Sequence, residues 1–130
     1  MTVRHHDLCF GCGQANLFGL QLELEEAEDG VSGRFFVKQD HQGPPGVAHG
    51  GIVATALDEA MALAVHAAGV HALTHTLEVK LEAPAPVGQF VAVEARIEER
   101  DDRRITASAT ASDPDGKPLA QAEGEFAIVE

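Results

Sequence analysis

Residues 41–64 read HQGPPGVAHGGIVATALDEAMALA, and they contain the one clear helix signal of the chain. A loop rich in glycine and proline comes first. Residues 50–68 then contain no proline and, after Gly51, no glycine until Gly69. Alanine, the strongest helix former, is abundant there. We therefore predict a helix over residues 50–68 that stops at Gly69, because glycine favours the end of a helix.

The predicted helix is apolar on nearly every side, whereas a helix at a protein surface has one polar face. A single sheet covers only one side of a helix, so the remaining apolar surface needs a second cover. A second subunit is the simplest candidate. We expect a homodimer, or a homotetramer built as a dimer of dimers.

After residue 19, most of the remaining chain alternates apolar and polar residues with the period of a β-strand. Clear alternation is typical of an antiparallel sheet with one buried face, and the helix is the obvious cover for that face. The prediction is one α+β domain over residues 1–130, an antiparallel sheet wrapped around one long central helix, with an irregular arm over residues 1–19. The six predicted strand segments cover residues 20–25, 31–38, 77–82, 91–98, 105–112 and 120–128.

Charge and hydropathy exclude several classes of partner. The formal net charge is −12, which argues against nucleic acid because phosphate contacts need clustered lysine and arginine. No uncharged apolar run reaches the roughly 20 residues of a membrane span. Residues 1–7 also lack the apolar stretch of a secretory signal. We expect a cytoplasmic protein that binds neither nucleic acid nor membrane.

Two carboxylates, Asp58 and Glu59, interrupt the apolar helix. Carboxylates rarely enter such surroundings without a partner or a purpose. Burial raises the pKa of a carboxyl group and suits it to act as a base or a nucleophile. The alternative is structural: either residue could face a solvent gap or cap a neighbouring backbone.

The helix opens with His49-Gly50-Gly51. Free N–H groups and the helix dipole favour a negative oxygen at such an end, and glycine lets a substrate approach closely. The pattern fits an oxyanion site, although a plain tight entry to the helix is the simpler alternative. Asp58 lies about 11 Å further along the axis. Either the substrate bridges that distance, or Asp58 faces the glycines of a partner chain.

The whole stretch over residues 41–64 resembles the hotdog-fold thioesterase superfamily, and more narrowly the branch related to phenylacetate-degradation thioesterases. In that family a loop leads to His-Gly-Gly, and an acidic residue follows nine positions after the histidine, which is Asp58 here. The segment CFGCGQANLFGLQL over residues 9–22 and the strand order are similar too. The resemblance implies a hotdog fold, an acyl-CoA substrate, hydrolysis of its thioester to free acid and CoA, and no cofactor.

The resemblance also implies roles for single residues. Asp58 would be the nucleophile or the general base on water. The backbone N–H of Gly50 or Gly51 would polarise the thioester carbonyl, and His49 would orient the loop or bind the substrate. Thr74 falls where some relatives carry a serine that helps to position water.

Two further positions are secondary candidates for the site. Glu59 neighbours Asp58 and could be the working carboxylate instead. Gly43 departs from the family pattern, because several relatives carry an asparagine there that touches the thioester carbonyl. The group that completes the oxyanion site is therefore open.

Two other functions remain as alternatives. A non-catalytic acyl-CoA-binding hotdog protein would use the same pocket without hydrolysis. An enoyl-thioester hydratase of this fold usually pairs an aspartate and a histidine in one short motif. Asp40-His41 is the nearest equivalent here, and it lies in the wrong place. We expect His41 and the other scattered histidines, His66, His71 and His75, to occupy surface or strand positions.

Near the start of the chain, Cys9 and Cys12 follow His5 and His6, and these four residues could supply zinc ligands. A single Cys-x-x-Cys pair without a second distant pair is a weak zinc signature, and no βαβ context supports a redox role. We therefore expect a reduced structural pair, with neither a metal nor a disulfide framework.

Phosphates of coenzyme A would need a local basic patch on this acidic chain. The candidate cations for this patch are six of the nine lysines and arginines: Arg34, Lys80, Arg96, Arg100, Arg103 and Arg104.

Overall fold

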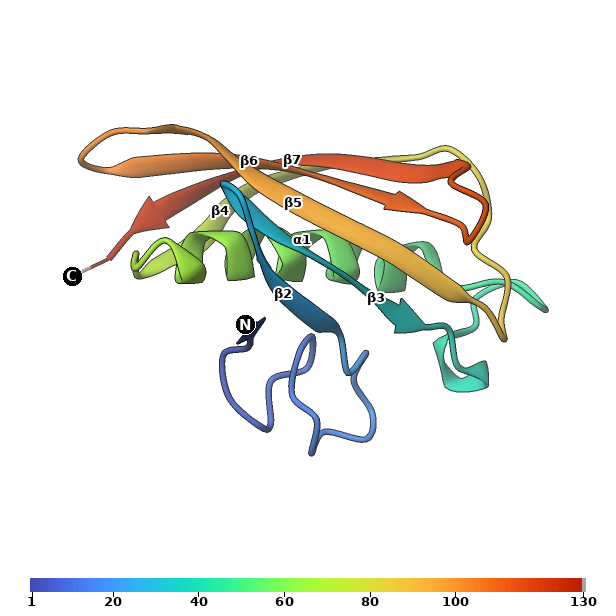
Figure 1. Ribbon diagram of the computed structural model, residues 1–130. Helices are drawn as coiled ribbons and strands as arrows, with labels where there is room; N and C mark the ends of the chain where they lie inside the picture. The colour runs from blue at the N-terminus through green and yellow to red at the C-terminus, as the bar shows by residue number, and fades with distance from the viewer. Residues whose placement is uncertain (130) are drawn as a thin grey trace.

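The computed structural model describes residues 1–129, in which a seven-stranded antiparallel sheet curves around one helix (Figure 1). The strands follow the order β1-β2-β3-β5-β6-β7-β4 across the sheet. This arrangement confirms the predicted α+β fold. The elements are β1 Thr2–Val3, β2 Glu23–Ala27, β3 Gly30–Phe36, the 3-10 turn η1 Gln39–His41, α1 Gly50–Ala67, β4 Ala72–Leu81, β5 Phe90–Arg100, β6 Arg104–Ser112 and β7 Pro118–Ile128.

Helix α1 agrees with the predicted range to within one residue. His49 caps its first turn, and Ala68 ends it with an N–H that donates to the Ala64 carbonyl at 3.2 Å. Gly69 follows with a φ of +80°, a left-handed conformation that glycine adopts without strain and that commonly ends helices. Within residues 1–129, no helix is long and apolar enough to cross a membrane.

The core lies between α1 and the concave face of the sheet. Leu57 and Met61 are fully buried on the helix side. Small residues on the sheet let the helix come close: a Cβ at Gly124 of β7 would lie 3.1 Å from the Met61 methyl carbon. In β6 and β7, the apolar residues of the alternating pattern are mostly alanines, and they form the inner face of the sheet. The inward-facing alanines of β6 and β7 are Ala107, Ala109, Ala111, Ala120 and Ala122.

The arm over residues 1–19 is less irregular than predicted. Thr2 and Val3 form the short strand β1, which pairs with Glu25 and Leu24 of β2. Val3 is buried by this pairing. Two residues are too few to show any periodicity, so the sequence carried no signal for this strand.

Strand β4 lies at one edge of the sheet, and its apolar side chains are only partly covered. Leu77 and Leu81 pair with Gly124 and Ala120 of β7, so they face the same side of the sheet as α1. The sequence predicted a buried face here, yet Leu77 is 40% exposed and Leu81 is 56% exposed. In a single chain these two leucines therefore form an apolar strip beside the helix, which we call the β4 strip.

Candidate active site

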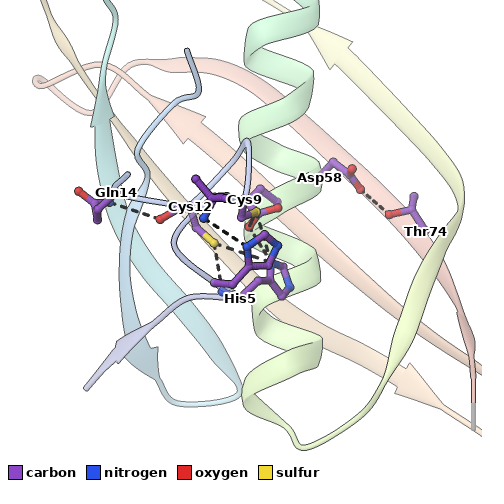
Figure 2. A network of polar contacts seen from close by, with 9 residues as sticks. His5, Cys9, Cys12, Gln14, Asp58 and Thr74 are labelled. Carbon is purple, nitrogen blue, oxygen red and sulfur yellow. Dashed lines mark hydrogen bonds and ion pairs between the residues drawn. The ribbon is translucent and has the colours of Figure 1, made fainter. Parts of the chain in front are cut away.

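Asp58 and Thr74 meet between α1 and the edge strand β4. The Thr74 hydroxyl donates a hydrogen bond to Asp58 Oδ1 at 2.8 Å (Figure 2). The register of β4 shifts between Thr74 and Thr76, which marks a β-bulge. Thr74 is paired with the buried Phe126, so it still faces the helix despite the bulge. Two residues that the resemblance singled out are thus brought together.

Burial raises the pKa of Asp58 above the usual value for an aspartate. The hydrogen bond from Thr74 lowers this pKa, and the nearby charge of Glu59 raises it. The net rise agrees with the physical argument from the apolar helix. A carboxylate whose pKa is raised is a better base than an exposed one, because proton affinity and basicity rise together.

His49 uses its side chain to close the first turn of α1. Its Nδ1 accepts the Gly51 N–H at 2.8 Å, so a neutral ring carries its proton on Nε2. The Gly51 N–H is therefore occupied. In residues 1–129 no acceptor pairs with the Gly50 N–H, so of the two expected oxyanion donors Gly50 is the one whose N–H is not already engaged.

Gly43 lies directly behind this histidine. A Cβ at position 43 would come within 2.9 Å of His49 Cα, which is closer than real Cβ contacts. The Gly43 N–H also donates to the Val47 carbonyl at 3.1 Å and closes the loop before the helix. An asparagine side chain would fit here only if the loop moved, so the departure from the family pattern is built into the local backbone.

His41 was expected at a surface or strand position, and that expectation is wrong. The residue is only 2% exposed. Its Nδ1 accepts the Lys38 N–H at 3.1 Å, and its Nε2 lies 3.3 Å from the Gly19 carbonyl. Its own carbonyl accepts the His49 N–H at 2.8 Å. Burial lowers the pKa of His41, so a neutral ring joins the arm, η1 and the start of α1.

Glu59 points away from Asp58, since consecutive helix residues are separated by about 100°. Its Oε2 lies 2.9 Å from His5 Nδ1 and accepts a hydrogen bond from Cys9 Sγ at 3.3 Å. Hydrogen bonds with Cys12 and Glu59 raise the pKa of His5 to about 11. Glu59 therefore belongs to a contact with the arm, on the other side of the helix from Thr74.

The four residues His5, His6, Cys9 and Cys12 do not come together as one ligand set. His6 Nδ1 accepts the Leu8 N–H at 3.2 Å, because the tight turn after it draws its ring back onto the local backbone. Glu59 lies beside His5, Cys9 and Cys12 in place of His6. Because Glu59 comes from the distant helix, the spacing of residues within the arm could not reveal it.

Two of the cations considered for phosphate binding already form ion pairs. Arg96 pairs with Glu98 at 2.9 Å, and Arg104 pairs with Glu125 at 2.7 Å. A hollow on the outer face of the sheet contains Lys80 together with Arg96, but acidic side chains also line it. Acidic side chains therefore surround these cations, in keeping with the net charge of −12.

Residues 45–120 match the family model described as the thioesterase superfamily. The chain belongs to the thioesterase superfamily. Mouse acyl-coenzyme A thioesterase THEM5 (Mus musculus) is 30% identical to it over 86 residues, which are 65% of this chain and 35% of THEM5. This member of the superfamily therefore aligns with about a third of the length of its curated relative.

Solved structures of the thioesterase superfamily share the fold. One crystal structure of a superfamily protein has a TM-score of 0.87 at 26% identity, covering 93% of this chain and 60% of the other. The PaaI protein from the Escherichia coli phenylacetic acid degradation operon has a TM-score of 0.77 at 16% identity, covering 82% of each chain. A Streptococcus pneumoniae thioesterase protein solved with coenzyme A has a TM-score of 0.78 at 17% identity, covering 83% and 85%. The predicted hotdog fold and thioesterase superfamily are confirmed, and the structures that share the fold include the phenylacetic acid degradation protein PaaI.

Proposed function

We propose that the protein is an acyl-CoA thioesterase in which Asp58 acts on the thioester. The observation that carries the proposal is a partly buried aspartate with a raised pKa, held by the Thr74 hydroxyl at 2.8 Å. The start of the same helix offers the Gly50 N–H for an oxyanion. The names of THEM5 and of the coenzyme A complex support this substrate class.

Hydrolysis follows from these groups in one of two ways. In the first, ionised Asp58 takes a proton from water, and the resulting hydroxide attacks the thioester carbonyl carbon. In the second, the carboxylate itself attacks and forms an anhydride that water then opens. In both, the Gly50 N–H stabilises the negative oxygen of the tetrahedral intermediate. The C–S bond breaks, and the CoA thiolate takes up a proton as the free acid is released.

A second copy of the chain would complete this site. Gly50 and Asp58 are eight residues apart on one helix, about 12 Å along its axis, which is too far for both to contact one carbonyl group. The β4 strip lies open beside Asp58, and β4 is an edge strand with unpaired backbone groups. We infer a homodimer, alone or within a tetramer, in which Asp58 of one protomer faces Gly50 of its partner.

The Streptococcus pneumoniae protein offers further support for the pair of side chains. It was solved as two variants, one with an aspartate and one with a threonine replaced by alanine. Those two positions are sixteen residues apart in that protein, which is also the separation of Asp58 and Thr74 here.

The contacts of His41 argue against the enoyl-thioester hydratase alternative. Both ring nitrogens of His41 are engaged with backbone groups, and the ring is buried. The residue therefore has no free nitrogen with which to move a proton on a substrate.

Release of free thiol from a panel of acyl-CoAs tests the proposed activity. We expect hydrolysis of at least one acyl-CoA with a kcat of about 1 s⁻¹ or more, in the ordinary range for enzymes. Short, branched, aromatic and long acyl groups should all be included, since the residues on the inner face of the sheet do not indicate which acyl chain length the protein accepts. Tight binding of these compounds without release of thiol would contradict the proposal and favour the non-catalytic binding protein.

The Thr74→Val variant tests whether Asp58 is the group that titrates during turnover. Asp58 must be ionised to act, so activity falls as the pH drops through its pKa. Removing the hydroxyl removes the interaction that lowers this pKa. The acidic limb of the kcat/KM profile should therefore move to higher pH, with a several-fold loss at acidic pH and a smaller loss on the plateau.

Thr55→Val is the matched control, because its hydroxyl donates to the Gly51 carbonyl instead, at 2.7 Å. It should leave the acidic limb in place. An acidic limb that does not move in Thr74→Val would mean that Asp58 does not control the rate.

A further inference from the structure

A cluster of metal-ligating side chains joins the N-terminal arm to α1, on the side of the helix away from Thr74. His5, Cys9 and Cys12 come from the arm and Glu59 comes from the helix. Figure 2 shows the arm residues gathered against one side of the helix and Asp58 with Thr74 on the other. The four ligand atoms lie within 4.8 Å of one another. We propose that this cluster is a structural zinc site, independent of the thioesterase chemistry.

The spacing of the ligand atoms fits a tetrahedral ion. Zinc bonds of about 2.0–2.3 Å place neighbouring ligand atoms about 3.3–3.8 Å apart. His5 Nδ1 lies 3.7 Å from Cys9 Sγ and 3.7 Å from Cys12 Sγ. Glu59 Oε2 lies 3.3 Å from Cys9 Sγ and 2.9 Å from His5 Nδ1. Of these four distances only the last must lengthen, by a few tenths of an ångström, and the remaining two pairs of ligand atoms lie within 4.8 Å.

The chemistry of the four ligands selects zinc over the common hard cations. Two thiolates and an imidazole are soft or borderline ligands, whereas magnesium and calcium prefer oxygen alone. Four protein ligands leave no open position for water, as in structural zinc sites. Cys12 is fully buried and Glu59 is largely buried, whereas Cys9 is partly exposed and His5 is exposed, so the site is shielded from solvent on its inner side.

The turn that contains the cysteines is shaped to bring them to Glu59. A Cβ at Gly11 would overlap Glu59 Cγ and Cδ, so the glycine leaves room for the helix carboxylate in its present position. A side chain at Gly13 would overlap the backbone of Asp7. The His5 N–H also donates to Cys12 Sγ at 3.1 Å, a contact that stabilises a thiolate ligand.

The zinc would fasten the arm to α1 at the residue next to Asp58. The competing arrangement is a metal-free cluster in which protonated His5 pairs with Glu59 and Cys9 Sγ donates a hydrogen bond to the same carboxylate. The two arrangements differ in metal content, which can be measured directly. Because the readout is metal content and not turnover, failure of the zinc site would leave the proposed thioesterase function standing, and the reverse also holds.

The experiment is metal analysis of the full chain, purified without a histidine tag, in a reductant that does not bind metals. We expect about one zinc per chain by mass spectrometry of the elements. After removal of zinc with a chelator, added cobalt(II) should give the intense thiolate-to-metal absorption and the visible bands of a tetrahedral site. Added zinc should abolish both. Wild-type protein that neither carries zinc nor takes up a stoichiometric amount of zinc or cobalt would overturn the proposal.

Variants assign the ligands. Cys9→Ser and Glu59→Gln alter partly exposed positions, and each should weaken zinc binding by at least about a hundredfold, beyond the 10–100-fold typical of groups that only support a ligand. His6→Gln is the matched control, because His6 neighbours a ligand but bonds to Leu8, and it should keep its zinc. Equal zinc in all three variants, with folding checked by circular dichroism, would also overturn the assignment.

Discussion

Replacement of Asp58 by asparagine is expected to leave the protein folded and to lower kcat by at least about 10²–10⁴-fold, the usual cost of losing a general base. Asparagine has nearly the same shape and can still accept the hydrogen bond from Thr74. It can neither take a proton from water nor attack the thioester. Acyl-CoA binding should therefore persist, and turnover on the best substrate should show the loss.

Glu59→Gln is the informative comparison, because it removes the neighbouring carboxylate on the other side of the helix. Its contacts with His5 and Cys9 mean that it acts on the arm, so kcat should fall far less than in Asp58→Asn. Normal turnover in Asp58→Asn with a dead Glu59→Gln would shift the catalytic assignment by one residue. Normal turnover in both would make the two carboxylates structural.

A charge in the β4 strip is expected to separate the two copies of the chain. Leu77→Asp would place a carboxylate in an apolar contact, and burying an unpaired charge costs about 3 kcal/mol or more. The dissociation constant of the dimer should rise by at least about a hundredfold. Light scattering at micromolar concentration should then give the mass of a monomer, and turnover should fall with it, because each site uses both chains.

Leu17→Asp is the control for this substitution. Leu17 is 74% exposed in the arm, so the same chemical change there should preserve both the dimer and turnover. A wild-type chain that is monomeric and fully active at micromolar concentration would contradict the shared site altogether.

Periodicity made most of the fold predictable. The change from period two to a long alanine-rich run places α1 between two groups of strands, and Gly69 and Asp113-Pro114-Asp115-Gly116 mark where elements end. These signals come from neighbouring residues in the sequence, so they can be recognised without knowing how the elements pack. The apolar helix surface also predicted a half-buried Asp58, because its neighbours along the helix are apolar in any fold that buries them.

Other parts of the site depend on contacts between distant segments, and the sequence carried no signal for them. His41 looks like any polar loop residue, yet it is buried because Gly19 and Lys38 both reach its ring. Glu59 looks like a second catalytic carboxylate, whereas His5 approaches it from more than fifty residues away. Occupation of the Gly51 N–H by His49 depends on a side-chain rotamer, which residue type does not determine.

The β-bulge between Thr74 and Thr76 adds one residue to β4. This extra residue determines which side of the sheet Thr74 faces relative to the leucines of the β4 strip. In a regular strand, positions 74 and 77 would face opposite sides of the sheet. The Thr74 hydroxyl could then not contact Asp58 while Leu77 faced the same side. The extra residue lets both face inward. Loss of one residue from this bend would force a choice: either the hydroxyl leaves the carboxylate, or the leucines turn outward. The contact of Thr74 with Asp58 and the inward-facing β4 strip therefore depend on the same bulge, and we expect an insertion or deletion at this point to disrupt one of them.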